Sequence, residues 1–103
     1  MIHNQHMYDG ITVESETDCT TYHVFGRFNY LLAKHLLKEF RKSTSEYYII
    51  NLKQVQSVDA SAIGTIAYLL EKTNDLNVSI IIEESCEQVR QVFSRSKIKT
   101  VYS

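Results

Sequence analysis

The sequence predicts a single α/β domain in which helices pack on a mixed sheet of four or five strands. Short segments rich in β-branched and aromatic residues alternate with longer segments whose apolar residues recur every three or four positions. Only a short polar turn separates the first two strand-like segments, which predicts an antiparallel hairpin. Helical segments separate the later strands, which predicts parallel pairing through right-handed crossovers.

The first half of the chain supplies the hairpin and one helix. Residues 11–15 alternate apolar and polar side chains, and residues 19–25 are rich in β-branched and aromatic ones. Residues 26–29 are expected to end the second strand, with Asn29 as the N-cap of a helix over residues 30–42. The apolar stripe of this helix comprises Leu32, Ala33, Leu36, Leu37 and Phe40, whereas Lys34, His35, Lys38, Glu39, Arg41 and Lys42 lie off it.

The second half continues the alternation. Residues 47–52 and 78–82 are largely apolar, as is typical of strands in the middle of a sheet, and residues 53–58 lead from the first of them to Asp59. A second helix is expected over about residues 61–73. We expect Ile63, Ile66, Ala67 and Leu70 on its buried side, and Ser61, Thr65, Tyr68 and Lys72 on its outer side with Leu69 at the border.

The C-terminal segment is expected to form a third helix and a short last strand. Ser85 and Gln88 have the spacing of a capping box, and Val89, Val92 and Phe93 form an apolar stripe after them. Residues 101–102 then add the strand.

Composition narrows the functional classes. The chain has 103 residues with 44% apolar residues, which suffices for one core, and its net charge of −1 without a basic stripe argues against nucleic acid as a partner. No apolar run is long enough for a membrane span, and residues 1–10 are predicted to be a flexible tail without a signal-peptide core. We therefore expect a cytoplasmic protein whose folded domain covers residues 11–103.

Catalytic and metal sites are not indicated by the sequence. Ser61 lacks the flanking glycines of a nucleophile elbow, although His23 or His35 could approach it in the fold. His3 and His6 fall in the predicted tail, and the His residues show no metal-ligand spacing. Cys19 and Cys86 are expected to be buried thiols. The expectation is a protein without enzymatic activity, metal or other cofactor.

The most informative segment is residues 58–64, VDASAIG, at a strand-to-helix junction. Asp59 is expected to cap the second helix, and the small residues after it leave the helix N-terminus open to a close partner or an anion. Tyr68 is an aromatic residue on the outer face of the same helix, which favours a role in partner contact.

Three segments together resemble the STAS family, the anti-sigma factor antagonist domains of bacterial partner switching. Residues 26–29, GRFN, resemble its G-x-[LF]-D motif. Residues 49–52, IINL, with residues 58–64 resemble its apolar-apolar-D-L and D-S-S-[GA]-[LI]-G signature. Residues 89–98, VRQVFSRSKI, resemble its closing helix. The resemblance extends from about residue 11 to residue 102 and implies a STAS-like single domain.

The resemblance implies a signalling switch in transcription regulation. In the family, a serine kinase phosphorylates the first Ser of D-S-S, a phosphatase removes the group, and the unmodified form binds an anti-sigma kinase. The expected partners are therefore a GHKL-type anti-sigma serine kinase and a PP2C-type phosphatase. A phosphoryl group adds about −1.5 to −2 charge inside such a contact.

This sequence departs from the family pattern at the decisive position. Ala60 aligns with the phosphoacceptor and has no hydroxyl, Ser61 aligns with the second Ser, and Asn29 replaces the motif's Asp. Three alternatives follow: a constitutive binder, transfer of the acceptor role to Ser61, or a natural or engineered locked form. An accessory STAS subunit of an ABC-type lipid transporter is the alternative function, because it needs no acceptor. The expected partner-binding residues are Asn29, Asp59, Ala60, Ser61, Ala62, Gly64, Thr65, Tyr68 and Leu69.

Overall fold

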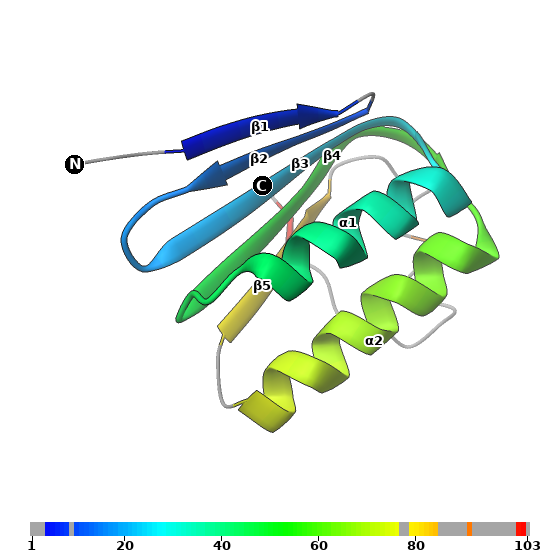
Figure 1. The fold of residues 1–103 in the computed structure, drawn as a ribbon. Coiled ribbons are helices and arrows are strands. Elements are labelled where there is room, and N and C mark those ends of the chain that lie inside the picture. Colours follow the sequence, from blue (N-terminus) through cyan, green and yellow to red (C-terminus); the bar gives the residue numbers. More distant parts are fainter. Residues whose placement is uncertain (1–3, 9, 77–78, 85–90, 92–100, 103) are drawn as a thin grey trace.

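The computed structural model describes residues 4–8, 10–76, 79–84, 91 and 101–102. Within these residues, six strands form one sheet in chain order, and two helices pack on it (Figure 1). The strands are β1 (Asn4–Tyr8), β2 (Ile11–Ser15), β3 (Cys19–Phe28), β4 (Tyr47–Val58), β5 (Ser79–Glu84) and β6 (Val101–Tyr102), and the helices are α1 (Tyr30–Lys42) and α2 (Ala60–Leu76).

The pairing of the strands confirms the predicted mixed sheet. Strands β2 and β3 form the antiparallel hairpin, and β3, β4, β5 and β6 are parallel to one another. Strand β1 pairs antiparallel with β2, so the prediction of a flexible tail over residues 1–10 is wrong for Asn4–Tyr8. These five residues carry no alternating apolar pattern, and they join the edge of the sheet through the backbone ladder.

Two strands are longer than the sequence predicts, and their common end positions the site. Strand β3 passes through Gly26, whose φ of 76° lies in the left-handed region, and the ladder to β4 shifts register on either side of it. The predicted strand break is therefore a bulge. Strand β4 includes residues 53–58, which we expected to be a connection. Because Phe28 pairs with Val58, Asn29 and Asp59 leave the sheet side by side.

Both helices cover the same face of the sheet (Figure 1). Alternate residues of the strands point into the core beneath them, among them Tyr22, Val24, Ile50 and Leu52. Helix α1 buries Leu32, Ala33, Leu36 and Phe40, as predicted, and Glu39 as well, which we had placed off the stripe. Its carboxylate Oε2 lies 3.1 Å from Lys42 Nζ, and this pairing compensates the burial of the charge.

Helix α2 is rotated relative to the prediction. Its buried side chains are Ala62, Ile66, Leu69 and Thr73, whereas Ala67 is exposed and Ile63 and Leu70 are half-buried. Thr73 can be buried because its hydroxyl donates to the carbonyls of Leu69 and Leu70, at 2.9 and 3.1 Å. The apolar periodicity favoured the bulkier aliphatic residues and missed this polar member of the face.

Only part of the C-terminal prediction falls on residues that the structure describes. The short last strand is confirmed as β6. The third helix from Ser85 with its stripe, Cys86 and most of the closing motif at residues 89–98 lie outside the described residues. No described helix is long and apolar enough to cross a membrane.

Candidate functional site

The Asp59 carboxylate joins the N-termini of both helices. Its Oδ1 accepts a hydrogen bond from the backbone N–H of Ala62 in α2 at 2.9 Å, and its Oδ2 accepts one from the backbone N–H of Tyr30 in α1 at 3.2 Å. The backbone N–H of Asp59 donates to the carbonyl of Phe28 at 3.2 Å, which ties the junction to the end of β3. The predicted cap of α2 is confirmed, and the same residue also supports α1.

Asn29 caps helix α1, as its position in the sequence predicts. Its side-chain Oδ1 accepts from the N–H of Leu32 at 3.3 Å, and its carbonyl accepts from the N–H of Ala33 at 2.8 Å. Asn29 and Asp59 thus satisfy the first N–H groups of two adjacent helices.

The charges at this junction nearly balance. Each helix N-terminus carries a partial charge of about +0.5, so two of them offset about one carboxylate. Asp59 provides that carboxylate, while Asn29 and Ala60 add no charge. An additional anion placed here would therefore meet a site whose positive potential is already used.

The exposed residues around Asp59 define the surface that we call the corner. It comprises Asn29, Asp59, Ala60, Ser61, Gly64, Thr65 and Tyr68; Thr65 is half-buried, and the others are exposed. Ala62 and Leu69 were expected to contact a partner, but both side chains are fully buried in the core. The rotation of α2 explains why both predictions were wrong, because it turns Ala62 and Leu69 toward the core.

The sequence reasoning missed two exposed apolar residues beside the corner. Tyr30 and Leu31 form the first turn of α1, and 57% and 61% of their surfaces are accessible. The signal was available, because burial of Leu32, Ala33 and Leu36 places the two preceding residues on the opposite side of the helix. They extend the corner with apolar area.

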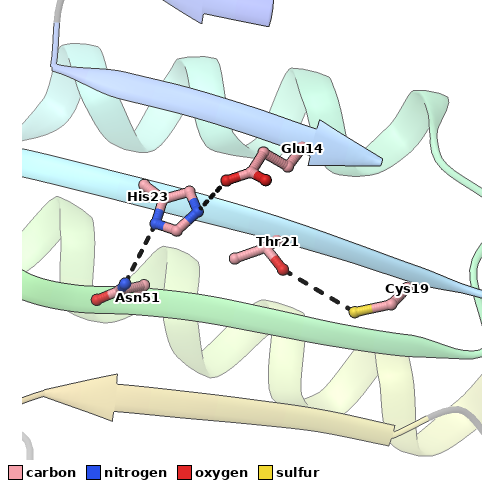
Figure 2. A network of polar contacts seen from close by, with 5 residues as sticks. All are labelled: Glu14, Cys19, Thr21, His23 and Asn51. Carbon is pink, nitrogen blue, oxygen red and sulfur yellow. Dashed lines mark hydrogen bonds and ion pairs between the residues drawn. The ribbon is translucent and has the colours of Figure 1, made fainter. Parts of the chain in front are cut away.

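The sheet face that α1 and α2 leave uncovered carries a polar network (Figure 2). His23 Nε2 lies 2.7 Å from Glu14 Oε1, and His23 Nδ1 lies 3.2 Å from Asn51 Nδ2. Asn51 Oδ1 accepts from the N–H of Lys53, which directs its NH₂ group toward the ring. The amide therefore donates to Nδ1, and Nε2 carries the proton donated to Glu14.

This network bears on the predicted chemistry of Ser61 and of the cysteines. Both ring nitrogens of His23 are engaged on the sheet face, so neither is directed to Ser61 at the start of α2 (Figure 2). Cys19 is a half-buried free thiol, 3.9 Å from Thr21 Oγ1, rather than the fully buried one expected. Among the described residues, no cluster of His, Cys, Asp and Glu side chains has the makeup of a metal site.

Comparison with known families assigns the chain. The family model for the STAS domain matches residues 11–102. The chain belongs to the STAS domain family. The resemblance carried by the three motifs is thereby confirmed, and the Asp59 junction occupies the strand-to-helix position that it predicted.

Solved structures with the same STAS fold are known. The unphosphorylated form of the anti-sigma factor antagonist SpoIIAA matches with a TM-score of 0.80 and 15% identity, covering 90% of this chain and 87% of that one. The phosphorylated form of SpoIIAA from Bacillus gives 0.77 and 14%, covering 90% of each chain. A putative anti-sigma factor antagonist from Thermotoga maritima gives 0.69 and 19%, covering 88% and 84%. No curated protein matches the chain in sequence.

Proposed function

We propose that this STAS domain is a regulatory protein that binds a signalling protein through the corner and acts by binding rather than by catalysis. The observation that carries the proposal is the geometry at Asp59. One carboxylate holds two helix N-termini, and Ala60, Ser61 and Gly64 beside it are exposed at the start of α2.

The side chains of the corner suit close protein contact. Small residues at Ala60, Ser61 and Gly64 allow a partner's backbone to approach the first turn of α2. Tyr68, 41% exposed, lies two turns further along the same helix and provides a rigid aromatic anchor of the kind that dominates binding energy. Tyr30 and Leu31 supply apolar area from the neighbouring helix.

The proposed partner is an anti-sigma factor or serine kinase of the GHKL type, with a PP2C-type phosphatase as a further candidate. Support comes from the family and from the similarity to SpoIIAA, an anti-sigma factor antagonist known in phosphorylated and unphosphorylated forms. The motif resemblance aligns Ala60, which has no hydroxyl, with the phosphoacceptor of the family. We therefore propose a constitutive binder that phosphorylation at this position does not release.

Ser61 is the alternative acceptor. Its side chain is exposed in the first turn of α2, next to Asp59. A phosphoryl group on it would add about −1.5 to −2 charge beside a carboxylate that already offsets both helix dipoles. Phosphorylation of Ser61 would consequently destabilise the helix junction at Asp59 and also block binding of the partner.

The absence of a hydroxyl at residue 60 also favours a second function, that of an accessory STAS subunit of an ABC-type lipid transporter. Such a subunit would dock on an ATPase or permease through the same corner and would need no phosphoacceptor. The identity of the captured partner distinguishes the two functions.

Co-purification from the native host tests the proposal, with the natural chain compared with an Ala60→Glu variant that should lose the partner. Ala60 is exposed, so the longer charged side chain should block the corner without unfolding the domain. A GHKL-type kinase or PP2C-type phosphatase recovered with the natural chain and lost with Ala60→Glu would support the regulator. Transporter subunits lost in the same way would favour the second function. A partner that the Ala60→Glu variant retains would refute the claim that the partner binds through the corner.

Phosphorylation is tested separately with the recovered kinase. We expect no label on the natural chain and label on residue 60 in the Ala60→Ser variant. Label on Ser61 of the natural chain would contradict the constitutive binder and support the alternative acceptor.

A further inference from the structure

Helix α1 carries a row of exposed cations that the corner does not use. Because Leu32, Leu36 and Phe40 are buried, the opposite side of the helix faces solvent. Lys34, Lys38 and Arg41 lie there at positions i, i+4 and i+7, on adjacent turns, and all three are exposed. We call these three residues the basic face. The sequence analysis had expected no basic stripe, because the net charge of the whole chain is close to zero.

Folding does not account for the basic face. Within the described part of the chain, none of its three residues has a carboxylate partner, and the one acid of α1, Glu39, is buried and bonded to Lys42. Like charges at i and i+4 destabilise a helix slightly. Arg41 in the last turn gains from the helix dipole, but Lys34 and Lys38 lie too far from the C-terminus to do so.

An apolar groove runs between the cations. It has a volume of about 450 Å³, and the described residues that line it are Leu37 together with Lys34, Lys38, Arg41 and Lys42. Long basic side chains line such a groove with their aliphatic stems and hold their charged ends at its rim. This arrangement fits an apolar side chain that is flanked by carboxylates.

The charge of the remaining chain selects the class of partner. Helix α1 holds four of the eleven Lys and Arg residues but one of the twelve Asp and Glu residues, so the rest has seven basic and eleven acidic residues. A nucleic acid or an anionic membrane presents phosphates well beyond one helix and would meet this acidic remainder. A short acidic segment of a protein would contact α1 alone.

We propose that the basic face docks an acidic amphipathic segment of a protein partner. One apolar side chain of the segment enters the groove beside Leu37, and its carboxylates lie opposite Lys34, Lys38 and Arg41. The proposal shares with the corner only the expectation of a protein partner. The probe below does not involve the corner, so its failure would leave the proposed function untouched.

Nuclear magnetic resonance of the whole chain, titrated with a synthetic acidic peptide, tests the proposal. The peptide carries Glu at i, i+4 and i+7 around one Leu, and its partner peptide has Gln in place of each Glu. We expect saturable shifts at Lys34, Leu37, Lys38 and Arg41 with the Glu peptide, several-fold weaker binding with the Gln peptide, and further weakening as salt is added.

Charge reversal on the two helices provides matched variants. Lys38→Glu should weaken peptide binding about tenfold, because it removes one attraction and adds one repulsion. Lys72→Glu makes the same change in net charge on the exposed side of α2 and should change binding less than about twofold.

Four results would overturn the proposal. The first two are the absence of saturable binding at about 1 mM peptide and chemical shift changes centred outside the basic face. The other two are an equal loss of peptide affinity in Lys38→Glu and Lys72→Glu, and tighter binding to duplex DNA or to phosphatidylglycerol vesicles than to the Glu peptide.

Discussion

The two ends of helix α1 are held by different kinds of interaction. At its N-terminus, Asn29 and Asp59 hold backbone N–H groups through short polar side chains and leave their surroundings exposed. At its C-terminus, buried aromatic rings and hydroxyl groups enclose the helix end, a region that we call the closed end and define as Tyr22, Phe40, Ser43, Ser45 and Tyr48.

The closed end combines ring packing with hydrogen bonds. The rings of Tyr22 and Tyr48 are nearly parallel at 5°, with centroids 6.3 Å apart, and Phe40 lies 5.0 Å from Tyr48. The hydroxyls of Tyr22 and Ser43 share a hydrogen bond of 3.1 Å, while the hydroxyl of Tyr48 accepts from the N–H of Ser45 and donates to the carbonyl of Ser43.

The difference separates stability from recognition along one helix. The ring contacts of Tyr22, Tyr48 and Phe40 add to the stability of the closed end, whereas the residues of the corner are mostly exposed. The corner is held by hydrogen bonds worth about 1 kcal/mol each, so its outward side chains can differ without loss of the fold. Four predictions test this division, from the largest expected effect to the smallest.

Truncation at the closed end should cost the most. Tyr22→Ala removes a fully buried ring, and we expect the free energy of unfolding in urea to fall by about 3–5 kcal/mol. Tyr22→Phe keeps the ring and loses only the hydrogen bond to Ser43, so it should cost about 1 kcal/mol. A loss below about 1 kcal/mol for Tyr22→Ala would remove the distinction between the two ends.

Removal of the shared carboxylate should have an intermediate effect. Asp59→Ala breaks hydrogen bonds to both helices, so the free energy of unfolding should fall by about 1–2 kcal/mol. Asp59→Asn keeps one side-chain oxygen as an acceptor and should cost less. Urea titration of both variants measures this, and an Asp59→Asn variant as stable as the natural chain would indicate that Asp59 caps only one helix.

Alkaline pH should act on the closed end through Tyr22. Burial, with smaller contributions from Tyr48 and Glu39, raises the pKa of Tyr22, and the hydrogen bond to Ser43 opposes this only in part. Above about pH 10, the ordinary Tyr pKa, the unfolded chain ionises at this residue while the folded chain keeps the proton. The free energy of unfolding should therefore fall by up to about 1.4 kcal/mol per pH unit from this residue.

The Tyr22→Phe variant isolates this contribution from other groups that titrate in the same range. Its stability deficit relative to the natural chain at pH 8 should shrink as the pH rises above 10, measured by urea unfolding at each pH. A deficit that stays constant up to pH 11 would show that the pKa of Tyr22 is not raised.

Truncation at the corner should affect stability least. Tyr68→Ala changes an exposed residue, so the free energy of unfolding should move by less than about 0.5 kcal/mol, whereas affinity for the captured partner should fall by about 2 kcal/mol. Leu76→Ala removes another exposed apolar residue from the far end of α2 and should leave the affinity unchanged. Calorimetric titration measures both affinities, and equal losses would argue against a specific contact at Tyr68.

Features set by local sequence could be predicted, and features set by contacts distant in sequence could not. The start of α1 and its stripe follow from Asn29 and the spacing of the apolar residues, and the cap at Asp59 follows from the position of an Asp directly before the second helical segment. The second hydrogen bond of Asp59, to Tyr30, spans 29 positions and depends on the common end of β3 and β4.

Individual side chains explain the other differences. Residues 4–8 carry no alternation that would mark a strand, because edge pairing with β2 depends on the backbone. Glu39 and Thr73 are buried because a lysine and two carbonyls satisfy them, and sequence periodicity does not record such partners. The burial of Ala62 and Leu69, which we expected to contact a partner, follows from the same rotation of α2 that buries Thr73.

Hydrogen exchange of the chain with and without its captured partner tests the central claim most directly. The account predicts that partner binding slows exchange at the amides of the corner, in the first turns of α1 and α2, and leaves residues 43–48 at the closed end unchanged. Protection confined to the closed end, or equal protection at both ends, would contradict the assignment of recognition to the corner.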